Sequence, residues 1–316
     1  MASLREFEAA AEALRGTIVR TPLVPLASSA AREIWIKPET LQPTGSFKVR
    51  GVLNAVARMA ESTRARGLST VSAGNTAKAL AWCGRRFGVP ARSLMPEGAP
   101  AAKIEAVRAL GGTPVLVPTD QVFRFLRERE WEREPFAFVH PWTDPDLHAG
   151  HGSMGLEILA DLPDVETVFL PVGGGGLLAG VGGALKAAQP ALRIVAVEPE
   201  GCPSFHASRS AGRSVTVDCR TICDGVAVPY VAEELLPLLC ELADEVLLVS
   251  EDEVRAAIRL LASSSHLVAE GAGALAVAAA LKTPASARGR CVCPVTGGSI
   301  DADKLAAILG MPDLVR

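Results

Sequence analysis

Short apolar runs alternate with segments of helical periodicity along most of the chain. Seven runs are long enough for one strand each: 68–72, 91–95, 113–117, 167–172, 193–199, 245–249 and 291–295. Strands buried on both faces have such nearly continuous apolar sequence, whereas strands with one solvent face alternate apolar and polar residues. The helical segments lie near 76–87 and 100–110, from Leu177, and after Ser250. This pattern predicts an α/β fold in which helices cover mostly parallel sheet.

An amphipathic helix is expected at the start of the chain, and one polar segment interrupts the alternation. Leu4, Phe7, Ala11 and Leu14 recur at helical spacing among charged residues. The segment 136–152 contains two prolines and several polar residues. Prolines and polar clusters break regular structure, so this segment is expected to be a crossover between two lobes.

The composition of the chain argues against nucleic acids and membranes as binding partners. The 32 basic and 35 acidic residues give a net charge of −3, which provides no broad basic surface for nucleic acid. The most apolar stretch, 272–281, is shorter than the roughly 20 residues that cross a bilayer, and residues 1–15 do not resemble an export signal. The seven cysteines form no disulfide framework or zinc pattern. We therefore expect a cytoplasmic protein with reduced thiols that binds neither membranes nor nucleic acid.

The sequence PTGSFKVRG at 43–51 places a lysine at a helix start. Pro43 and Gly45 end the preceding extended segment, and Ser46 is a good N-cap for the run that follows. Lys48 then lies in the first turn, where the backbone dipole disfavours a cation. A lysine that loses its proton easily suits Schiff-base chemistry, although a surface lysine at a helix start would give the same sequence.

Four consecutive glycines follow an apolar strand and precede a helix: Gly173, Gly174, Gly175 and Gly176. Without Cβ atoms, their N–H groups can surround an anion, and the dipole of the following helix favours a phosphate there. The loop lacks the Lys-Ser ending of a P-loop and the G-x-G-x-x-G pattern of dinucleotide sites. A tight turn alone would also explain the glycines.

Two other strand ends carry polar or small residues. After the run 68–72, the sequence Ser72-Ala73-Gly74-Asn75-Thr76 opens a helix, and free N–H groups at a helix start can hold a carboxylate. Asn75 can donate to a ring hydroxyl there, or it can simply cap the helix. After the run 291–295, Thr296 should project at the carboxyl edge of the sheet, where ligands of open α/β sheets bind.

Taken together, these motifs resemble the serine/threonine dehydratase and serine racemase group of fold-type II pyridoxal phosphate (PLP) enzymes. The likeness runs from RTPL at 20–23 through KPETLQPTGSFKVRG, SAGN, GGGGLLAG, VEPEG, TICDGVAV and LVAEGAGALA to VTGGSID. It covers nearly the whole chain in family order. The resemblance implies a tryptophan synthase β-like fold, with 1–66 and 144–316 forming a large cofactor-binding domain and 67–143 a small mobile domain. It also implies a homodimer.

The resemblance assigns cofactor contacts to particular residues. Lys48 would form the Schiff base with PLP and remove the α-proton of a small amino acid, with Phe47 beside the cofactor ring. Asn75 would bind the 3′-hydroxyl. The phosphate would lie on 173–177, which includes Leu177, and Thr296 would meet the pyridine nitrogen.

The substrate side of the site departs from the family pattern. By resemblance, residues 72–76 would receive the substrate carboxylate and Glu270 would line the same site. Racemases of the group carry a serine at the position of Ala73, which argues against efficient racemisation. Thr76 and Lys78 replace a usual histidine and glutamine, so substrate choice is expected to be unusual.

No metal site is expected. Glu198 is only a weak candidate, because Ser204 stands where the family's divalent-cation site has an aspartate, and one carboxylate fewer weakens binding of a hard cation. Three histidines of the polar segment lack an acidic or cysteine partner at ligand spacing. They are expected to be structural or substrate-gating: His140, His148 and His151.

The activity that the resemblance implies is β-elimination: dehydration and deamination of a small β-hydroxy amino acid, such as L-threonine or L-serine, to a 2-oxo acid and ammonia. Thr296 favours this outcome, because a neutral hydroxyl withdraws fewer electrons from the ring than a carboxylate would, which favours prompt loss of the β-substituent. The alternatives are a serine racemase, a β-replacement (cysteine-synthase-like) enzyme, and a PLP-binding protein without turnover. A nicotinamide-dependent oxidoreductase lacks its acidic ribose partner.

Overall fold

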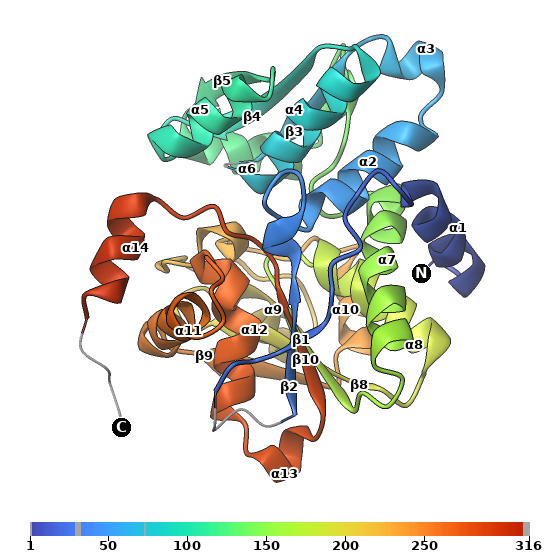
Figure 1. The fold of residues 1–316 in the computed structure, drawn as a ribbon. Helices are drawn as coiled ribbons and strands as arrows, with labels where there is room; N and C mark the ends of the chain where they lie inside the picture. The colour runs from blue at the N-terminus through green and yellow to red at the C-terminus, as the bar shows by residue number, and fades with distance from the viewer. Residues whose placement is uncertain (1, 29–32, 73, 312–316) are drawn as a thin grey trace.

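Two separate sheets organise the molecule into a larger and a smaller lobe (Figure 1). The structure is a computed structural model and describes residues 2–28, 33–72 and 74–311. The sheet of the larger lobe has the order β1-β2-β10-β7-β8-β9. Its strands are β1 (Val24–Pro25), β2 (Ile34–Pro38), β7 (Thr167–Pro171), β8 (Arg193–Pro199), β9 (Glu245–Val249) and β10 (Cys291–Val295). All neighbours are parallel except the pair β1 and β2.

The smaller lobe, at the top of Figure 1, contains a four-stranded parallel sheet in the order β5-β4-β3-β6. Its strands are β3 (Leu68–Val71), β4 (Ala91–Pro96), β5 (Thr113–Val117) and β6 (Ala137–Phe138). Three helices connect them: α4 (Asn75–Phe87), α5 (Ala101–Ala109) and α6 (Thr119–Arg127). The three apolar runs of this lobe therefore form strands where the pattern predicts them. β3 is buried along its whole length and β4 along most of it, whereas the edge strand β5 is partly exposed.

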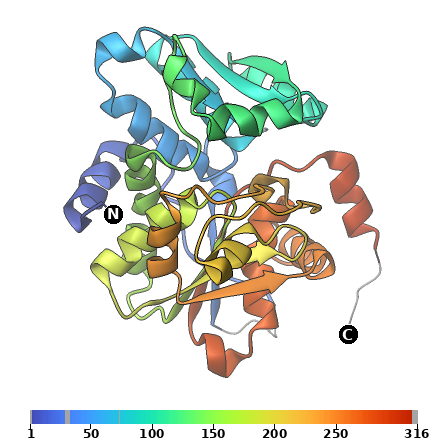
Figure 2. The same cartoon turned by 180° about the vertical axis from the view of Figure 1, so that it is seen from behind.

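Helices cover both faces of the larger sheet (Figures 1 and 2). On one face lie α7 (Pro145–Asp161) and α8 (Gly183–Ala188), and on the other lie α11 (Glu251–Ser263) and α12 (Gly271–Lys282). The other helices are α1 (Leu4–Leu14), α2 (Lys48–Arg58), α3 (Glu61–Arg64), α9 (Ser204–Ala211), α10 (Leu236–Leu242), α13 (Ala285–Arg288) and α14 (Ala302–Leu309). Of these, α2 packs against α4 and α7, and α3 lies beside the smaller lobe. Successive residues of a strand point to opposite faces. Phe169 of β7 accordingly packs in the cluster of α11 and α12, and its neighbours Val168 and Leu170 pack in the cluster of α7 and α8. The prediction of two lobes with mostly parallel, helix-covered sheets is confirmed.

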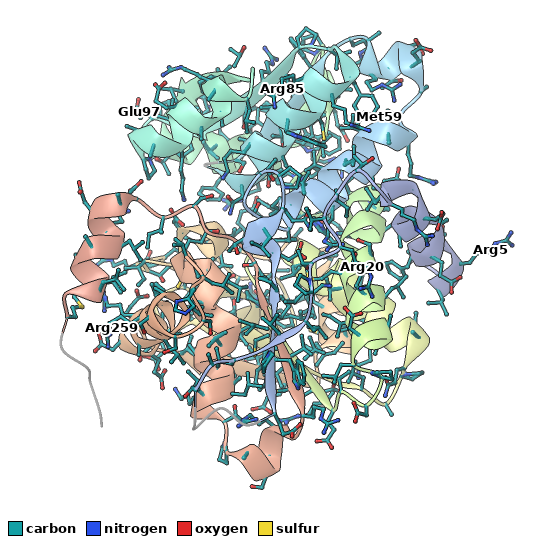
Figure 3. All side chains as sticks on the ribbon, viewed as in Figure 1. Arg5, Arg20, Met59, Arg85, Glu97 and Arg259 are labelled. Atoms are coloured by element: carbon teal, nitrogen blue, oxygen red, sulfur yellow. A yellow bond between two sulfur atoms is a disulfide. The ribbon has the colours of Figure 1, made fainter. Side chains whose placement is uncertain are left out.

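The first helix is amphipathic as predicted, with one change of register. Ser3 and Glu6 form a capping box at its N-terminus, which satisfies N–H groups that lack helical partners. Phe7, Ala10 and Leu14 are the buried positions, so the core contact is Ala10 and not Ala11. In Figure 3 the side chain of Arg5 points away from the body of the molecule. Among the described helices, none combines the length and the apolar character that a membrane crossing requires.

The expectation of an irregular crossover over 136–152 is wrong for its second half. Asp144 caps a helix there, since its Oδ1 accepts hydrogen bonds from the N–H groups two and three residues later, at 2.9 and 3.3 Å. Proline is well tolerated at the first helical position, and α7 begins at Pro145. His148 and His151 consequently lie on a buried helix rather than in a polar loop.

The expectation of seven reduced thiols is also wrong, because Cys202 and Cys219 form a disulfide. The bond joins the segment before α9 to a segment that continues into the turn Asp224–Val226. The sequence gives no sign of this pairing, since the two residues are 17 positions apart and neither is in a recognisable motif.

Replacing Cys219 with serine should lower the free energy of unfolding by about 2–4 kcal/mol, because the cross-link restricts the unfolded chain. Urea denaturation, followed by circular dichroism, measures the change. Cys240→Ser is the matched control, since Cys240 is a partly exposed free thiol. Equal unfolding midpoints for wild type and Cys219→Ser would contradict the stabilising role.

Candidate active site

A cavity between the lobes brings together residues from the carboxyl ends of several strands. It measures about 1140 Å³, including the part open to solvent. The residues singled out in the sequence line it together: Phe47, Lys48, Ser72, Gly74, Asn75, Thr76, Gly173, Gly174, Gly175, Gly176, Leu177, Glu270 and Thr296. Ala73 lies outside the described residues.

The start of α2 is attached to the end of β10 through the backbone. The N–H of Phe47 donates to the carbonyl of Thr296 at 3.0 Å, and Ser46 forms an isolated β-bridge with Gly297. The prediction that Ser46 caps the helix is wrong, because the N-cap is Phe47 and no side chain caps it. The pairing of Ser46 with Gly297 instead places Lys48, the first residue of α2, beside the strand end that carries Thr296.

The amine of Lys48 lies in surroundings that favour its neutral form. Its Nζ donates a hydrogen bond to the carbonyl of Pro141 at 3.3 Å and lies 5.1 Å from the centre of the Phe47 ring. Burial lowers the pKa of Lys48 to about 8, and the nearby carboxyl of Glu270 partly opposes that shift. Burial disfavours the charged form of any lysine. Lys48 therefore has a reactive amine near neutral pH.

The ring of Phe47 is supported from α7. The ring of His151 packs against it with centroids 4.7 Å apart. His151 is fully buried, and burial lowers the pKa of its imidazole well below the usual value. A neutral ring in this place supports Phe47 sterically, which agrees with the expectation of a structural histidine.

The glycine loop at 173–176 is shaped for an anion. In the described part of the chain, the N–H groups of its first three glycines donate to no protein oxygen. Gly175 has a φ of +93°, which other residues rarely adopt. A Cβ on Gly174 would lie 2.5 Å from the Trp142 ring. The close packing and the free N–H groups leave a backbone surface at the start of a helix, where phosphates bind.

Asn75 and Glu270 connect the two lobes beside this cavity. Asn75 Nδ2 donates to Glu270 Oε1 at 2.6 Å, and Ser299 Oγ donates to Asn75 Oδ1 at 2.9 Å. The alternative that Asn75 caps α4 is wrong, because Gly74 occupies the N-cap position. Within the described residues, Glu270 Oε2 has no hydrogen-bond partner, and burial raises the pKa of this carboxyl.

Sequence reasoning missed one charged residue of the cavity. Lys103 of α5 lines it and forms an ion pair with Asp224 of the larger lobe. A lysine in a helical segment is ordinarily solvated, and only the long-range fold reveals that this one is buried. The signal in the sequence is weak, since its partner lies 121 residues away.

The carboxylate of Glu198 binds backbone N–H groups of the protein. It accepts hydrogen bonds from the N–H groups of Phe205 and His206, both at 2.8 Å, near the start of α9. Burial raises its pKa to about 7. Over residues 2–28, 33–72 and 74–311, no group of three potential metal-ligating side chains occurs. Glu198 therefore anchors a helix in this structure.

The structure combines a two-lobed α/β fold with a buried lysine of lowered pKa and a glycine loop suited to a phosphate. These features define a class of enzyme that binds a phosphorylated carbonyl compound through a lysine. Residues 14–297 match the family described as "Pyridoxal-phosphate dependent enzyme". The chain belongs to this family, and PLP is its cofactor.

Similar proteins agree with this assignment. The L-threonine ammonia-lyase of Thermotoga maritima is 38% identical over 315 residues, which covers 98% of this chain and 78% of that protein. The catabolic L-threonine dehydratase of Escherichia coli K12 is 35% identical and covers 89% of this chain and 87% of its own length. Maize serine racemase superposes with a TM-score of 0.89 at 28% identity, over 97% of this chain and 96% of that one.

The lowered pKa of Lys48 predicts how the apoprotein takes up PLP. Only a neutral amine attacks a carbonyl, so the initial rate should rise with pH and reach half its maximum near pH 8. An ordinary exposed lysine, with a pKa of about 10.4, would give a midpoint more than two units higher. Early borohydride reduction followed by mass spectrometry measures the modified fraction of Lys48. A midpoint near the ordinary lysine value would contradict the electrostatic environment described above.

Proposed function

We propose that this protein eliminates the β-hydroxyl group of L-threonine or L-serine and releases a 2-oxo acid and ammonia. One observation carries the proposal: Lys48, an amine of lowered pKa, lies in the same cavity as the glycine loop and Thr296. The names of the relatives in Thermotoga maritima and Escherichia coli support the same reaction. Turnover requires a base at the α-carbon, and Lys48 is suited to that role.

The residues of the cavity fit the cofactor. The free N–H groups of 173–177 would hold its phosphate, Phe47 would pack beside its ring, and Lys48 would bind it covalently. Thr296 is buried at the strand end. Among the described residues, its hydroxyl contacts one backbone carbonyl, at a long 3.4 Å, which leaves it available to the pyridine nitrogen. When bound, PLP supplies an electron-withdrawing ring that acidifies the α-carbon of an amino acid.

Asn75 has a donor left for the ring hydroxyl. A side-chain amide carries two N–H donors, and only one of them is used by Glu270. The contact with Ser299 fixes the amide orientation, because the hydroxyl donates to Asn75 Oδ1. This arrangement supports the role that the family resemblance gives to Asn75.

The substrate would be held from the smaller lobe. The segment 72–76, which leads into α4, would receive the substrate carboxylate, and Lys48, which lines the same cavity, would remove the α-proton. We propose that residues 67–143 form a mobile domain that closes over the substrate, and that 1–66 and 144–316 form the cofactor-binding domain. Closure excludes water and positions the base. The resemblance also supports a homodimer.

Lys48→Ala should abolish covalent cofactor binding and lower 2-oxo acid release from L-threonine and L-serine by at least about 10²–10⁴-fold, the usual contribution of a positioned base. Release is measured by a coupled dehydrogenase assay, and covalent binding by mass spectrometry after borohydride reduction. Lys282→Met, which removes a surface lysine paired with Glu253, is the control. If wild-type enzyme loaded with PLP releases no 2-oxo acid from a panel of β-hydroxy amino acids, the proposed reaction is wrong.

Racemisation is the second candidate, because a serine racemase is structurally similar to this chain. Racemisation needs a proton donor on the face opposite the base, and the methyl group of Ala73 supplies none. Pyruvate should therefore exceed D-serine by at least about 10²-fold when the enzyme acts on L-serine. Ala73→Ser should raise D-serine formation and leave pyruvate release largely intact. Chiral chromatography quantifies both, and equal yields in wild type would favour the racemase.

A further inference from the structure

Lys103 is a buried cation that lies against the start of α4. Its side chain is 9% exposed. A Cβ on Gly74 would lie 3.1 Å from Lys103 Cδ and 3.7 Å from its Nζ. Gly74 belongs to the segment proposed to receive the substrate carboxylate. The ammonium group is therefore placed beside that segment, inside the cavity that also contains Lys48.

Lys103 is held in this place from the opposite lobe. Its Nζ pairs with Asp224, which lies in the turn Asp224–Val226 of the larger lobe. An ammonium group has three N–H donors, and Asp224 is the single acceptor that the described residues give it. Two donors remain for another anion. Asp224 is itself 41% exposed, so solvent partly screens the pair and leaves Lys103 able to attract a second negative group.

The charges around the cavity explain why a cation is needed there. Asp224 and Glu270 both line the cavity, and a substrate carboxylate would add a third acidic group. Lys103 acts on Glu270 as well. Burial raises the pKa of the Glu270 carboxyl, and the positive charge of Lys103 is the main influence that lowers it again. Like charges repel strongly in a partly desolvated site. Without Lys103, the acidic side chains would disfavour any amino acid that approaches with its carboxylate towards Gly74.

We propose that Lys103 is a specificity-determining residue that binds the α-carboxylate of the substrate, and that Asp224 positions it from the other lobe. The ligand class is an α-amino acid, as opposed to an amine without a carboxylate. This inference uses the proposed function only for the identity of the substrate. Because Lys103 and Asp224 belong to different lobes, a substrate carboxylate bound to Lys103 would be held by the smaller lobe while Asp224 fixes the ammonium group from the larger one.

The test compares two ligands that differ only in the carboxylate. L-Alanine and ethylamine both present an amine to PLP, and neither has a β-hydroxyl to eliminate. Each is titrated against holoenzyme while the visible absorption of the cofactor is recorded. In Lys103→Met, the dissociation constant of L-alanine should rise about 10- to 100-fold, as expected for the loss of a hydrogen bond between charged groups. That of ethylamine should change less than about threefold, because it makes no such bond.

Steady-state kinetics gives a second measurement. For L-threonine and L-serine, Lys103→Met should raise KM by a similar factor and leave kcat within about threefold, since a contact made equally in the ground and transition states affects KM alone. Lys103→Arg keeps the charge and should recover most of the lost affinity. Asp224→Asn removes the positioning partner and should give a smaller rise in KM than Lys103→Met.

Lys186→Met is the matched control. Lys186 forms an ion pair with Asp244 in which the side chains are 17% and 43% exposed, close to the 9% and 41% of Lys103 and Asp224. Lys186 is not among the residues that line the cavity, so its loss should leave both dissociation constants unchanged.

Equal weakening of L-alanine and ethylamine in Lys103→Met would overturn the proposal, as would a fall in kcat with unchanged KM. If Lys103→Met does not fold, Asp224→Asn decides: a raised dissociation constant for L-alanine, with that of ethylamine unchanged, supports the proposal, and an unchanged dissociation constant for L-alanine overturns it. The spectral titrations need no elimination. They therefore test Lys103 even if the wild-type enzyme proves inactive on L-threonine and L-serine, which would contradict the proposed function alone.

Discussion

The active site depends on the backbone pairing between the start of α2 and the end of β10. Phe47 donates to the carbonyl of Thr296, and Ser46 bridges to Gly297. The two segments are about 250 residues apart in the sequence, and β2 and β10 are parallel neighbours whose carboxyl ends coincide. Polar groups that follow these strands therefore meet at one edge. The position of Lys48 is fixed by the sheet and not by its own side-chain contacts.

A buried ionic cluster keeps this helix start rigid. Arg50, two residues after Lys48, is fully buried and donates to both oxygens of Glu39, at 2.7 and 2.8 Å. Its other donors reach Glu157 of α7 at 2.8 and 2.9 Å. The guanidinium thus joins α2 to α7 and to the short helical turn Glu39–Leu41 that follows β2, by planar, charge-assisted bonds. Removing one member of such a cluster leaves a buried charge unpaired, which typically costs about 3–5 kcal/mol. Lys48 is therefore carried on an element that has little freedom to shift.

Patterns of short range could be read from the sequence, and contacts of long range could not. The apolar runs predicted the strands because most of these strands are buried. The run of four glycines is itself a short-range pattern, and the structure adds that a Cβ on Gly174 would collide with Trp142. The helix from Pro145 was missed, since an Asp-Pro pair reads equally as a turn or as a helix start. The Lys103–Asp224 pair and the Cys202–Cys219 bond join segments that the fold alone brings together.

Burial has opposite effects on the two ionisable groups that face each other in the cavity. It lowers the pKa of Lys48 and raises that of Glu270, while the charge of Glu270 favours the ionised form of Lys48. A further loss of solvent would have two opposing effects on these groups. Burial would favour the neutral amine and the protonated acid, because it disfavours charge. The attraction between the two charged forms would also become stronger, which favours the ion pair. Lys103 opposes the protonation of Glu270 from the smaller lobe. The smaller lobe therefore contributes to the charge state of the cavity through Lys103. In the closure proposed above, solvent exclusion would act on the proton state of Lys48 without any residue approaching the amine directly.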